Sequence, residues 1–468
     1  MKENSTVSLG SGSITSLLYK YSVPAIIAMT ATSLYNLTDS IFIGKGVHHL
    51  ALTGLAVTFP FMNLATAFGS LVGVGAATLI SIKLGQKDYS SANKVLGNVL
   101  VLDLIIGIAF TLAFLPVLDE VLYFFGASSK TIKYARDYMQ IILIGNVVTH
   151  TYLGLNAVLR ASGFPRMAMY VTLLSVAVNF ALNPLFIFVF GWGIRGAAWA
   201  TVLSQAISLS LQFVRLSSKD REIRFGRGIY RLQKHLVARI FSIGSSSFMM
   251  NACSCLIVIL ITRGLREHGG DLAIGAYGIV NRVAFIFLMI VMGLNQGMQP
   301  IAGYNFGAEK YSRVTEVTKL TIMFAVTVST IGFLVSELFP TAIIKIFTSH
   351  KDLIRESVTG IRIIFALFPL VGFQMVASNF FMSVGLSRTA IFLSLTRQAL
   401  FLIPCLLILP TFMGTLGIWV SLPVADFVSS AVSATVLISY FRKCNKNVAE
   451  SAGKAPRQKS RWNVGLTN

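Results

Sequence analysis

The sequence predicts an all-α polytopic membrane protein with twelve transmembrane helices in two six-helix lobes. Of its 468 residues, 54% are hydrophobic and 12% are charged, whereas about 25% of residues are charged in an ordinary soluble domain. Apolar stretches close to the ~20 residues that cross a bilayer recur along the whole chain. The second half of the chain also repeats the first half at a fixed offset.

The two halves are related by an offset of 222 residues, the difference in number between Gly297 and Gly75. Tyr89 aligns with Tyr311 at the same offset, and the match continues without a net gap as far as Ala168. Six spans per half is an even number, so both halves enter the membrane from the same side. The internal repeat is therefore parallel, about an axis along the membrane normal, and such duplicated halves are typical of secondary transporters.

Each predicted span is a continuous apolar run. Continuous rather than alternating apolar residues indicate helices and not a β-barrel. In chain order the predicted spans cover residues 16–43, 52–82, 96–118, 134–159, 167–190, 197–216, 238–263, 273–303, 316–338, 358–384, 389–411 and 418–441.

Polar segments divide the chain into five parts. A cytoplasmic N-terminal segment (1–15) precedes the N-lobe (16–216), and a basic cytoplasmic linker (217–237) leads to the C-lobe (238–441). The final part (442–468) is a basic, polar cytoplasmic tail that is predicted to be disordered. The polar N-terminus leads into a long first span with no small-residue cleavage site, so no cleaved signal peptide is expected.

The formal net charge is +21, which in a soluble protein would indicate nucleic-acid binding. Here the basic residues concentrate in the linker and the tail, which an even number of spans separates. The two segments therefore lie on one side of the bilayer, and the positive-inside rule makes that side cytoplasmic. We expect cytoplasmic termini and no nucleic-acid partner. The residues concerned are Lys219, Arg221, Arg224, Arg227, Arg231, Lys234 and Arg239, then Arg442, Lys443, Lys446, Lys454, Arg457, Lys459 and Arg461.

The first span carries one polar stripe. Thr32, Asn36 and Asp39 recur at helical spacing with Tyr35 beside them. A charged side chain in hydrocarbon costs at least ~2.5 kcal/mol, so Asp39 is a candidate functional residue. Desolvation penalises the charged form of a carboxyl group, so Asp39 can bind and release a proton, or ionise to hold Na⁺. The alternative is an ion pair with Lys45 near the outer interface.

The fifth span carries Asn179 and Asn183 one helical turn apart, followed by Pro184. Their amides share a helix face, and the proline interrupts the backbone bonding just beyond them. Carbonyl and amide oxygens freed in this way suit a hard cation such as Na⁺. Asparagines in membrane helices also form hydrogen bonds that hold helices together, which is the alternative interpretation.

Charged residues in the C-terminal half allow two interpretations. Arg397 and Gln398 lie in the eleventh span and Asp426 in the twelfth. Since arginine keeps its charge, Arg397 needs a partner, and it either pairs structurally with Asp426 or lines a substrate cavity. Arg282 in the eighth span is similar, and Asp103 in the third span lies close enough to the inner end to be an interface residue.

The repeat is symmetric in fold but not in charge. The position that matches Asp39 in the second half is Ile261, so a cation site around Asp39 belongs to the N-terminal half. The C-terminal half contributes an apolar surface rich in Met and Phe, which suits varied apolar ligands or faces lipid. Its members are Met249, Met250, Phe285, Phe287, Met289 and Met292.

Enzymatic and channel functions are disfavoured. An integral membrane enzyme needs clustered His, Asp or Glu at a membrane face, and a channel needs a ring of ligands. The six histidines are scattered, and the four cysteines lie in spans or at the inner edge, where neither a disulfide nor a metal site is expected. We therefore expect no enzyme activity and no cofactor. The cysteines are Cys253, Cys255, Cys405 and Cys444, and the histidines are His48, His49, His150, His235, His268 and His350.

Several segments resemble the multidrug and toxic compound extrusion (MATE) family of bacterial type. The resemblance extends from about residue 15 to residue 440 and includes a specific Gln-Pro-x-x-Gly-Tyr-Asn-x-Gly-Ala motif. The segments are NRVAFIFLMIVMGLNQGMQPIAGYNFGAEKY (281–311), YNLTDSIFIG, NFALNPLFIF, GIRGAAWATVLSQ and GIWVSLPVAD.

The resemblance implies an exporter whose two lobes form a V-shaped cavity, in which uptake of H⁺ or Na⁺ drives outward movement of organic, often cationic, compounds. It implies a monomer in the cell inner membrane and a cation site of Asp39, Asn179, Asn183 and Thr201. Many members have an aspartate where this chain has Asn183, which favours H⁺ here; Na⁺ would be ligated by Asp39. We expect the substrate cavity to include Tyr35, Asn36, Gln296, Arg397 and Asp426.

The nearest alternative is a lipid-linked oligosaccharide flippase of the same superfamily. Such a protein needs a more cationic cavity to bind pyrophosphate. Arg282 and Arg397 are the only clear intramembrane arginines in this sequence.

Overall fold

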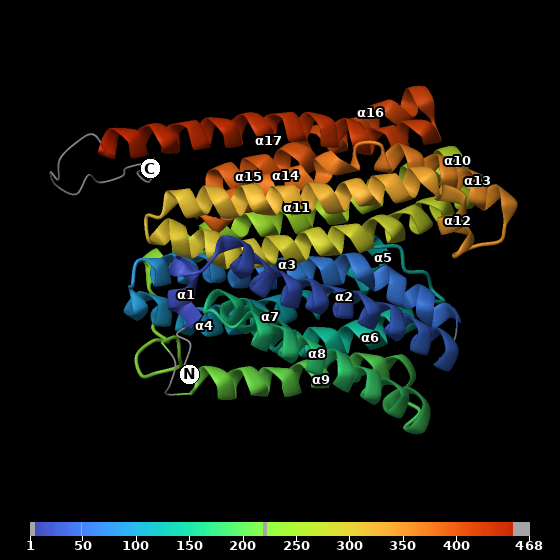
Figure 1. The fold of residues 1–468 in the computed structure, drawn as a ribbon. Helices are drawn as coiled ribbons and strands as arrows, with labels where there is room; N and C mark the ends of the chain where they lie inside the picture. Colours follow the sequence, from blue (N-terminus) through green and yellow to red (C-terminus); the bar gives the residue numbers. More distant parts are fainter. Residues whose placement is uncertain (1–4, 48, 219–221, 453–468) are drawn as a thin grey trace.

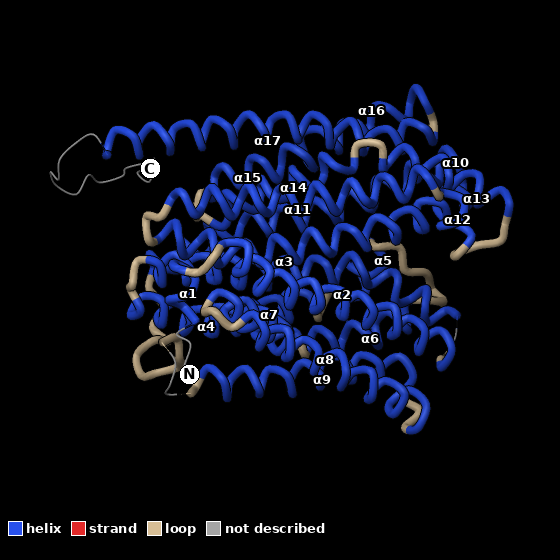
Figure 2. The backbone as a smooth tube through the Cα atoms, viewed as in Figure 1, coloured by secondary structure: helices blue, strands red, loops and turns tan. Residues whose placement is uncertain are grey.

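The computed structural model describes residues 5–47, 49–218 and 222–452. Helices account for almost all of these residues, and no strand occurs among them (Figure 2). In chain order the helices are α1 (Ser5–Ser11), α2 (Ile14–Gly46), α3 (His49–Gly85), α4 (Tyr89–Phe114), α5 (Leu118–Phe124), α6 (Ile132–Ile144), α7 (Asn146–Ala161), α8 (Pro165–Pro184), the π-helix η1 (Leu185–Val189), α9 (Gly193–Leu216), α10 (Lys234–Gly307), α11 (Tyr311–Leu338), α12 (Pro340–Lys345), α13 (Lys351–Phe365), α14 (Phe368–Ser383), α15 (Ser387–Leu395), the π-helix η2 (Thr396–Leu402), α16 (Ile403–Met413) and α17 (Thr415–Ala452).

The described helices account for the twelve predicted spans. Nine of them are long and apolar enough to cross a membrane, and two bent pairs, α6 with α7 at 56° and α13 with α14 at 49°, bring the number to eleven. The 74-residue α10 contains two spans, because Gly270 breaks it with φ 63° and ψ −159°. The predicted spans 134–159 and 358–384 are thus each bent near the middle.

The structure extends the repeat well beyond the residues that align by sequence. Five pairs of helices begin 222 residues apart, including the short helices α5 and α12, which no sequence similarity relates. The paired first residues are Tyr89 and Tyr311, Leu118 and Pro340, Asn146 and Phe368, Pro165 and Ser387, and Gly193 and Thr415. The parallel two-lobe architecture is therefore confirmed.

The two halves form adjacent helical lobes, blue to green and yellow to red in Figure 1. Glycines bring their backbones together along the seam. A Cβ on Gly85 would lie 1.9 Å from the carbonyl oxygen of Tyr304, and a Cβ on Gly307 would lie 2.1 Å from that of Ile82. Because these two contacts exchange under the 222-residue offset, the seam follows the twofold symmetry of the repeat.

Two segments at the same end of the molecule cross from one lobe to the other. The N-terminal strap, residues 5–12, precedes the N-lobe but is held by the C-lobe. Arg313 Nη2 donates to Gly12 O at 2.6 Å, and Lys310 Nζ donates to Gly10 O at 2.7 Å. Asn305 Nδ2 donates to Leu9 O at 3.0 Å, and Leu9 itself is fully buried.

The linker strap, residues 222–233, precedes the C-lobe but is held by α4 of the N-lobe. Asn98 Nδ2 donates to Arg231 O at 3.2 Å, and Asn98 Oδ1 accepts from Gln233 N at 3.1 Å. Asn93 Nδ2 donates to Glu222 O at 2.9 Å. Residues 9 and 231 are 222 apart, so the two straps are themselves related by the repeat.

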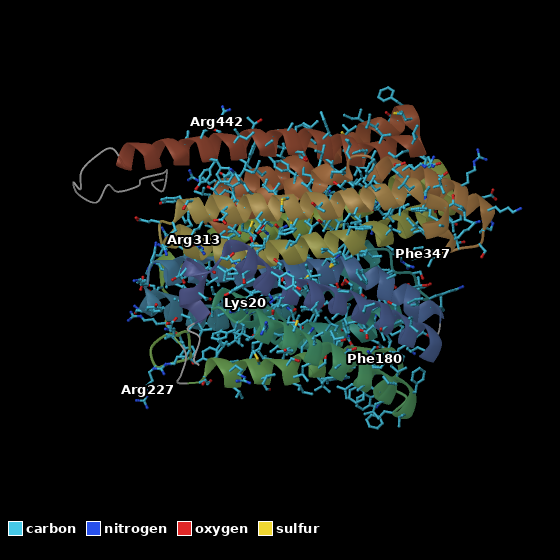
Figure 3. The ribbon with its side chains drawn as sticks, in the orientation of Figure 1. Lys20, Phe180, Arg227, Arg313, Phe347 and Arg442 are labelled. Atoms are coloured by element: carbon cyan, nitrogen blue, oxygen red, sulfur yellow. The ribbon has the colours of Figure 1, made fainter. Side chains whose placement is uncertain are left out.

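Both straps and the C-terminal part of α17 lie at one end of the bundle, and α5, α12 and α13 lie at the other (Figure 1). α17 continues to Ala452, so the first part of the predicted tail is helical, and residues 453–468 lie outside the described residues. Arg227, Arg313 and Arg442 all lie toward the strap end, whereas Phe347 lies at the opposite end (Figure 3).

Candidate cation site

Asp39 lies in the N-lobe, near the C-terminal end of α2, and only 5% of its surface is exposed. Asn183 Nδ2 donates a hydrogen bond to its Oδ1, and the Tyr35 hydroxyl, one turn earlier on α2, lies close to the carboxyl group. Every partner named here is neutral. The alternative of an ion pair with Lys45 concerns a side chain that lies outside the described residues.

The two asparagines predicted to share a face of α8 both reach the site. Asn183 Nδ2 also donates to Asn179 Oδ1 at 2.7 Å. With its amide turned by 180°, Asn179 places its nitrogen 3.1 Å from Asp39 Oδ1 and its oxygen 3.3 Å from Thr201 N. Both amides are buried, with 1% and 0% exposure, so α8 presents fixed polar groups to Asp39.

Thr201 on α9 connects the asparagines to two tyrosines. Its hydroxyl lies 2.8 Å from the Tyr35 hydroxyl and 3.4 Å from Asn179 Nδ2. The Tyr138 hydroxyl on α6 lies close to Thr201 as well, and Tyr138 is 2% exposed. The sequence did not identify Tyr138, because a tyrosine within an apolar span gives no signal that distinguishes it from core residues.

The local fold explains why the site is polar in an apolar lobe. Pro184 ends α8, and the π-helix η1 follows it directly; π-helical turns are rare and occur frequently at functional sites. The surrounding side chains form an apolar cluster that includes Ile43, Met139 and Ala197. A carboxyl group in this setting has few water contacts, and its neighbours among the described residues are neutral amides and hydroxyls.

The described members of the predicted substrate cavity lie in three places. Tyr35 belongs to the Asp39 cluster, and the side chain of Asn36 lies outside the described residues. Gln296 lies at the seam, with Nε2 3.2 Å from the sulfur of Met29 on α2. In the C-lobe, Arg397 Nε donates to Asp426 Oδ1 at 2.7 Å, which is the structural pair considered from the sequence.

Three other residues singled out in the sequence have different surroundings. Gln398, next to Arg397, donates to Ser254 Oγ at 3.2 Å. Arg282 is exposed on α10. Asp103 is not an interface residue: it is 0% exposed, and its Oδ2 lies only 2.1 Å from where a Cβ on Gly154 would be. Glycine at position 154 therefore makes room for a carboxyl group deep in the lobe.

Asp103 differs from Asp39 in its hydrogen bonding. Among the described residues, neither carboxyl oxygen of Asp103 has a hydrogen-bond partner. The described residues also contain no group of three or more His, Cys, Asp or Glu that could hold a metal ion. Asp39 is thus the buried carboxyl group with a set of polar neighbours from several helices.

Comparisons with known proteins agree on one family. A family model described as MatE matches residues 24–185 and 243–408. The multidrug export protein MepA of Staphylococcus haemolyticus is 26% identical over 439 residues, which cover 94% of this chain and 96% of that protein. MepA of Staphylococcus aureus strain NCTC 8325 is 27% identical over 426 residues, with coverage of 90% and 92%.

Solved structures agree with the family match. The MATE multidrug transporter DinF-BH, solved in complex with a ligand, is 33% identical with a TM-score of 0.86, covering 92% of this chain and 96% of that one. A MATE protein in the bent conformation superposes with a TM-score of 0.89 at 21% identity, covering 95% and 99%. The two segments that match the family model fall one in each lobe and together make up most of the sequence, so this chain belongs to the MatE family of multi-pass membrane transporters.

Proposed function

We propose that the protein is a cation-coupled antiporter that exports amphipathic, often cationic, organic compounds by alternating access. The observation that carries the proposal is the buried carboxyl group of Asp39, which accepts a hydrogen bond from the neutral amide of Asn183 and lies close to the Tyr35 hydroxyl. Relatives named as multidrug export proteins, and a 33% identical structure named as a multidrug transporter, support the class of cargo.

The geometry favours H⁺ over Na⁺ as the coupling ion. Asn183 donates to Asp39 through Nδ2, while its buried Oδ1 has no partner among the described residues. A half-turn of this amide would let Oδ1 accept a hydrogen bond from protonated Asp39. The same side chain therefore suits both protonation states, whereas a dehydrated Na⁺ would find a single carboxylate, Asp39, to neutralise it.

Proton binding can be coupled to movement of the helices because the site joins α2 to α8 and α9. Asp39 and Tyr35 lie on α2, and their partners lie on α8 and α9. Protonation removes the negative charge that attracts these donors, so it changes the packing of α2 against its neighbours. If proton and drug favour opposite arrangements of the lobes, each weakens the binding of the other by the same free energy.

The strap end is the cytoplasmic end in this proposal. Basic residues concentrate there, as Arg227 and Arg442 illustrate (Figure 3), and positive charge is retained on the cytoplasmic side. The lobes are in close backbone contact near Gly85 and Gly307 at this end, which supports an outward-facing state. Protons entering from outside would gain about 2.3 kcal/mol per charge for each 100 mV of membrane potential.

The proposed setting is a bacterial inner membrane with the protein acting as a monomer. The two lobes of one chain supply both sides of the seam through pairs such as Gly293 and Ile26. A second copy is therefore not needed to form an alternating-access pathway.

The test is dye efflux from proteoliposomes energised separately by a pH gradient and by a Na⁺ gradient. The pH gradient should drive efflux, and Asp39→Asn should abolish it. Asp103→Asn is the matched control, because it makes the same change at another buried carboxyl group of the N-lobe and should leave efflux intact. Efflux that persists in Asp39→Asn under the same gradient would refute the coupling role of Asp39.

The oligosaccharide flippase remains the alternative to be tested, and the Arg397–Asp426 pair counts against it. A pyrophosphate group needs cationic partners, and Arg397 is already neutralised by Asp426 at 2.7 Å. Gradient-independent movement of a pyrophosphate-linked lipid by the same proteoliposomes would favour the flippase.

A further inference from the structure

A cavity of about 400 Å³ lies at the strap end of the seam and is lined by both lobes. Its apolar floor includes Leu79 and Ile82 from α3 of the N-lobe and Ile243 and Val384 from the C-lobe. All four side chains are at most 8% exposed. The floor is therefore a buried apolar surface that neither lobe forms alone.

The rim of this cavity is polar and carries more positive than negative charge. Arg239 near the start of α10 and Lys443 in α17 line it, together with one carboxylate, Glu309, and all three side chains are exposed. The hydroxyls of Ser242 and Ser387, which also line the cavity, lie 2.7 Å apart.

A third basic side chain extends the positive rim along α17. Arg442 lines a neighbouring open cavity together with Lys443, and it lies at the same end of the molecule as Arg227 and Arg313 (Figure 3). A cavity with an apolar floor and a cationic rim matches a ligand that has an anionic head and an apolar body.

We propose that this cavity is a binding site for an anionic phospholipid, whose phosphate contacts Arg239 and Lys443 and whose acyl chains lie on the apolar floor. Basic pockets between membrane helices on the cytoplasmic side bind anionic lipid head groups. Arginine and lysine both bind phosphate oxygens well. A lipid in this site touches α3 of one lobe and α10 and α17 of the other, so it favours the arrangement in which the seam is closed.

Glu309 separates this proposal from a cytoplasmic entry site for a cationic drug. An anionic ligand is repelled by the Glu309 carboxylate and attracted by Arg239 and Lys443, whereas a cationic ligand experiences the opposite. Neutralising Glu309 must therefore strengthen binding of an anionic lipid and weaken binding of a cation. Glu309 has φ 59°, and glutamine at this position carries the same backbone cost, which makes Glu309→Gln a clean change of charge.

The experiment measures lipid binding to the full-length protein, independently of transport. The protein is reconstituted in nanodiscs of phosphatidylcholine with increasing phosphatidylglycerol, and the rise in melting temperature is titrated. Arg239→Gln/Lys443→Gln should weaken the apparent affinity by about fivefold for each basic side chain removed, and Glu309→Gln should strengthen it. Arg227→Gln/Lys234→Gln is the control, because it removes the same charge at the same end outside the cavity.

Two further measurements decide whether a lipid bound in the cavity causes the rise in melting temperature. Ser242→Trp fills the cavity without changing charge and should abolish the lipid-dependent shift, whereas a loss of folding would lower the melting temperature in phosphatidylcholine alone. Inorganic phosphate should not reproduce the shift; if it does, the site binds free anions and not a lipid. Equal weakening by the cavity and control pairs, or weakening by Glu309→Gln, would overturn the proposal. None of these results depends on whether Asp39 couples transport to protons.

Discussion

Asp39 and Ile261 occupy matching positions in the first helix of each lobe, and their surroundings are chemically opposite. Around Asp39, neighbouring helices supply two asparagines and a threonine. The C-lobe has apolar side chains or a thiol at every matching position, and Ile261 is fully buried in an apolar cluster with Ile257 and Leu402. The residues that match Tyr35, Asn179, Asn183 and Thr201 are Ile257, Phe401, Cys405 and Pro423.

The opposite difference occurs one helical turn away, where the C-lobe holds the charged residues and the N-lobe holds uncharged ones. Arg397 and Asp426 form an ion pair in the C-lobe, and the matching residues in the N-lobe are Ser175 and Ser204, both buried. Asp426 is neutralised by a guanidinium that keeps its charge, whereas the described partners of Asp39 are neutral. The two lobes share their helix positions, but of these two carboxyl groups Asp426 has a cationic partner and Asp39 has neutral partners among the described residues.

The largest effect is expected when the carboxyl group is moved from the N-lobe to the matching position in the C-lobe. Asp39→Asn/Ile261→Asp should not restore gradient-driven efflux, because Phe401 and Cys405 offer no amide to a carboxyl group at position 261. Burying the new carboxyl group should also destabilise the protein by at least ~2.5 kcal/mol. Efflux and thermal unfolding in detergent measure both effects, with Asp39→Asn/Ile261→Leu as the control for the change at position 261. Restored efflux would mean that the coupling site needs only a carboxyl group in either lobe.

The next largest effect is expected when the C-lobe ion pair is replaced by the two serines found at the matching positions of the N-lobe. Arg397→Ser or Asp426→Ser alone should lower stability by about 2 kcal/mol, because each leaves a partly buried charge without its partner. Arg397→Ser/Asp426→Ser recreates the Ser175 and Ser204 arrangement and should recover most of the loss. Thermal unfolding of the three variants measures the coupling energy; additive losses would show that the pair is not the unit of stability.

Adding a second carboxyl group to the N-lobe site should change its ion preference. In Asn183→Asp, the new carboxylate lies beside Asp39, and the added negative charge should strengthen Na⁺ binding by about tenfold or more. Efflux driven by a Na⁺ gradient measures the change. Asn183→Cys, which copies Cys405 of the C-lobe, is the uncharged control and should gain no response to Na⁺. An unchanged response in Asn183→Asp would mean that the number of carboxylates does not set ion choice here.

Most of the fold could be predicted from the sequence, because apolar spans and a fixed offset are properties of the chain itself. Hydropathy did not reveal the bends between α6 and α7 or between α13 and α14, since a bent and a straight span have the same composition. The offset also related only similar residues, so the correspondence of α5 with α12, which share no motif, required the structure.

Some polar residues of the N-lobe could likewise be identified from the sequence, whereas others required the structure. Asp39, Asn179 and Asn183 were evident because an ionisable group and paired amides are unusual in apolar spans. Tyr138 was not, because its contact with Thr201 depends on how α6 packs against α9. The position of Asp103 along its span suggested the interface, but its burial depends on the space that Gly154 leaves on α7, which no local pattern reveals.

The two lobes also differ in the loops that precede α4 and α11 at the strap end. In the N-lobe, Asp88 accepts from Ser91 N at 3.0 Å and pairs with Lys83 at 3.2 Å, so the loop before α4 bonds within itself. The matching residue in the C-lobe is Lys310, which donates to Gly10 O of the N-terminal strap instead. The N-lobe loop thus forms these bonds with its own neighbours in sequence, whereas the C-lobe loop holds the N-terminal strap, which leads into the N-lobe.

Releasing each strap separately should give the smallest effect. Arg313→Ala removes donors to Leu9 O and Gly12 O and should speed protease cleavage within residues 5–12, whereas Asn98→Ala should do so within 222–233. A charged hydrogen bond contributes about 1.5–3 kcal/mol and a neutral one about 1 kcal/mol, so Arg313→Ala should have the larger effect. Each variant is the control for the other strap. Because both straps cross the seam, release of either should also favour opening of the lobes at this end, which accessibility of a cysteine introduced at Ser81 would report. Faster cleavage without greater accessibility at position 81 would mean that the straps are held by the lobes but do not hold the lobes together.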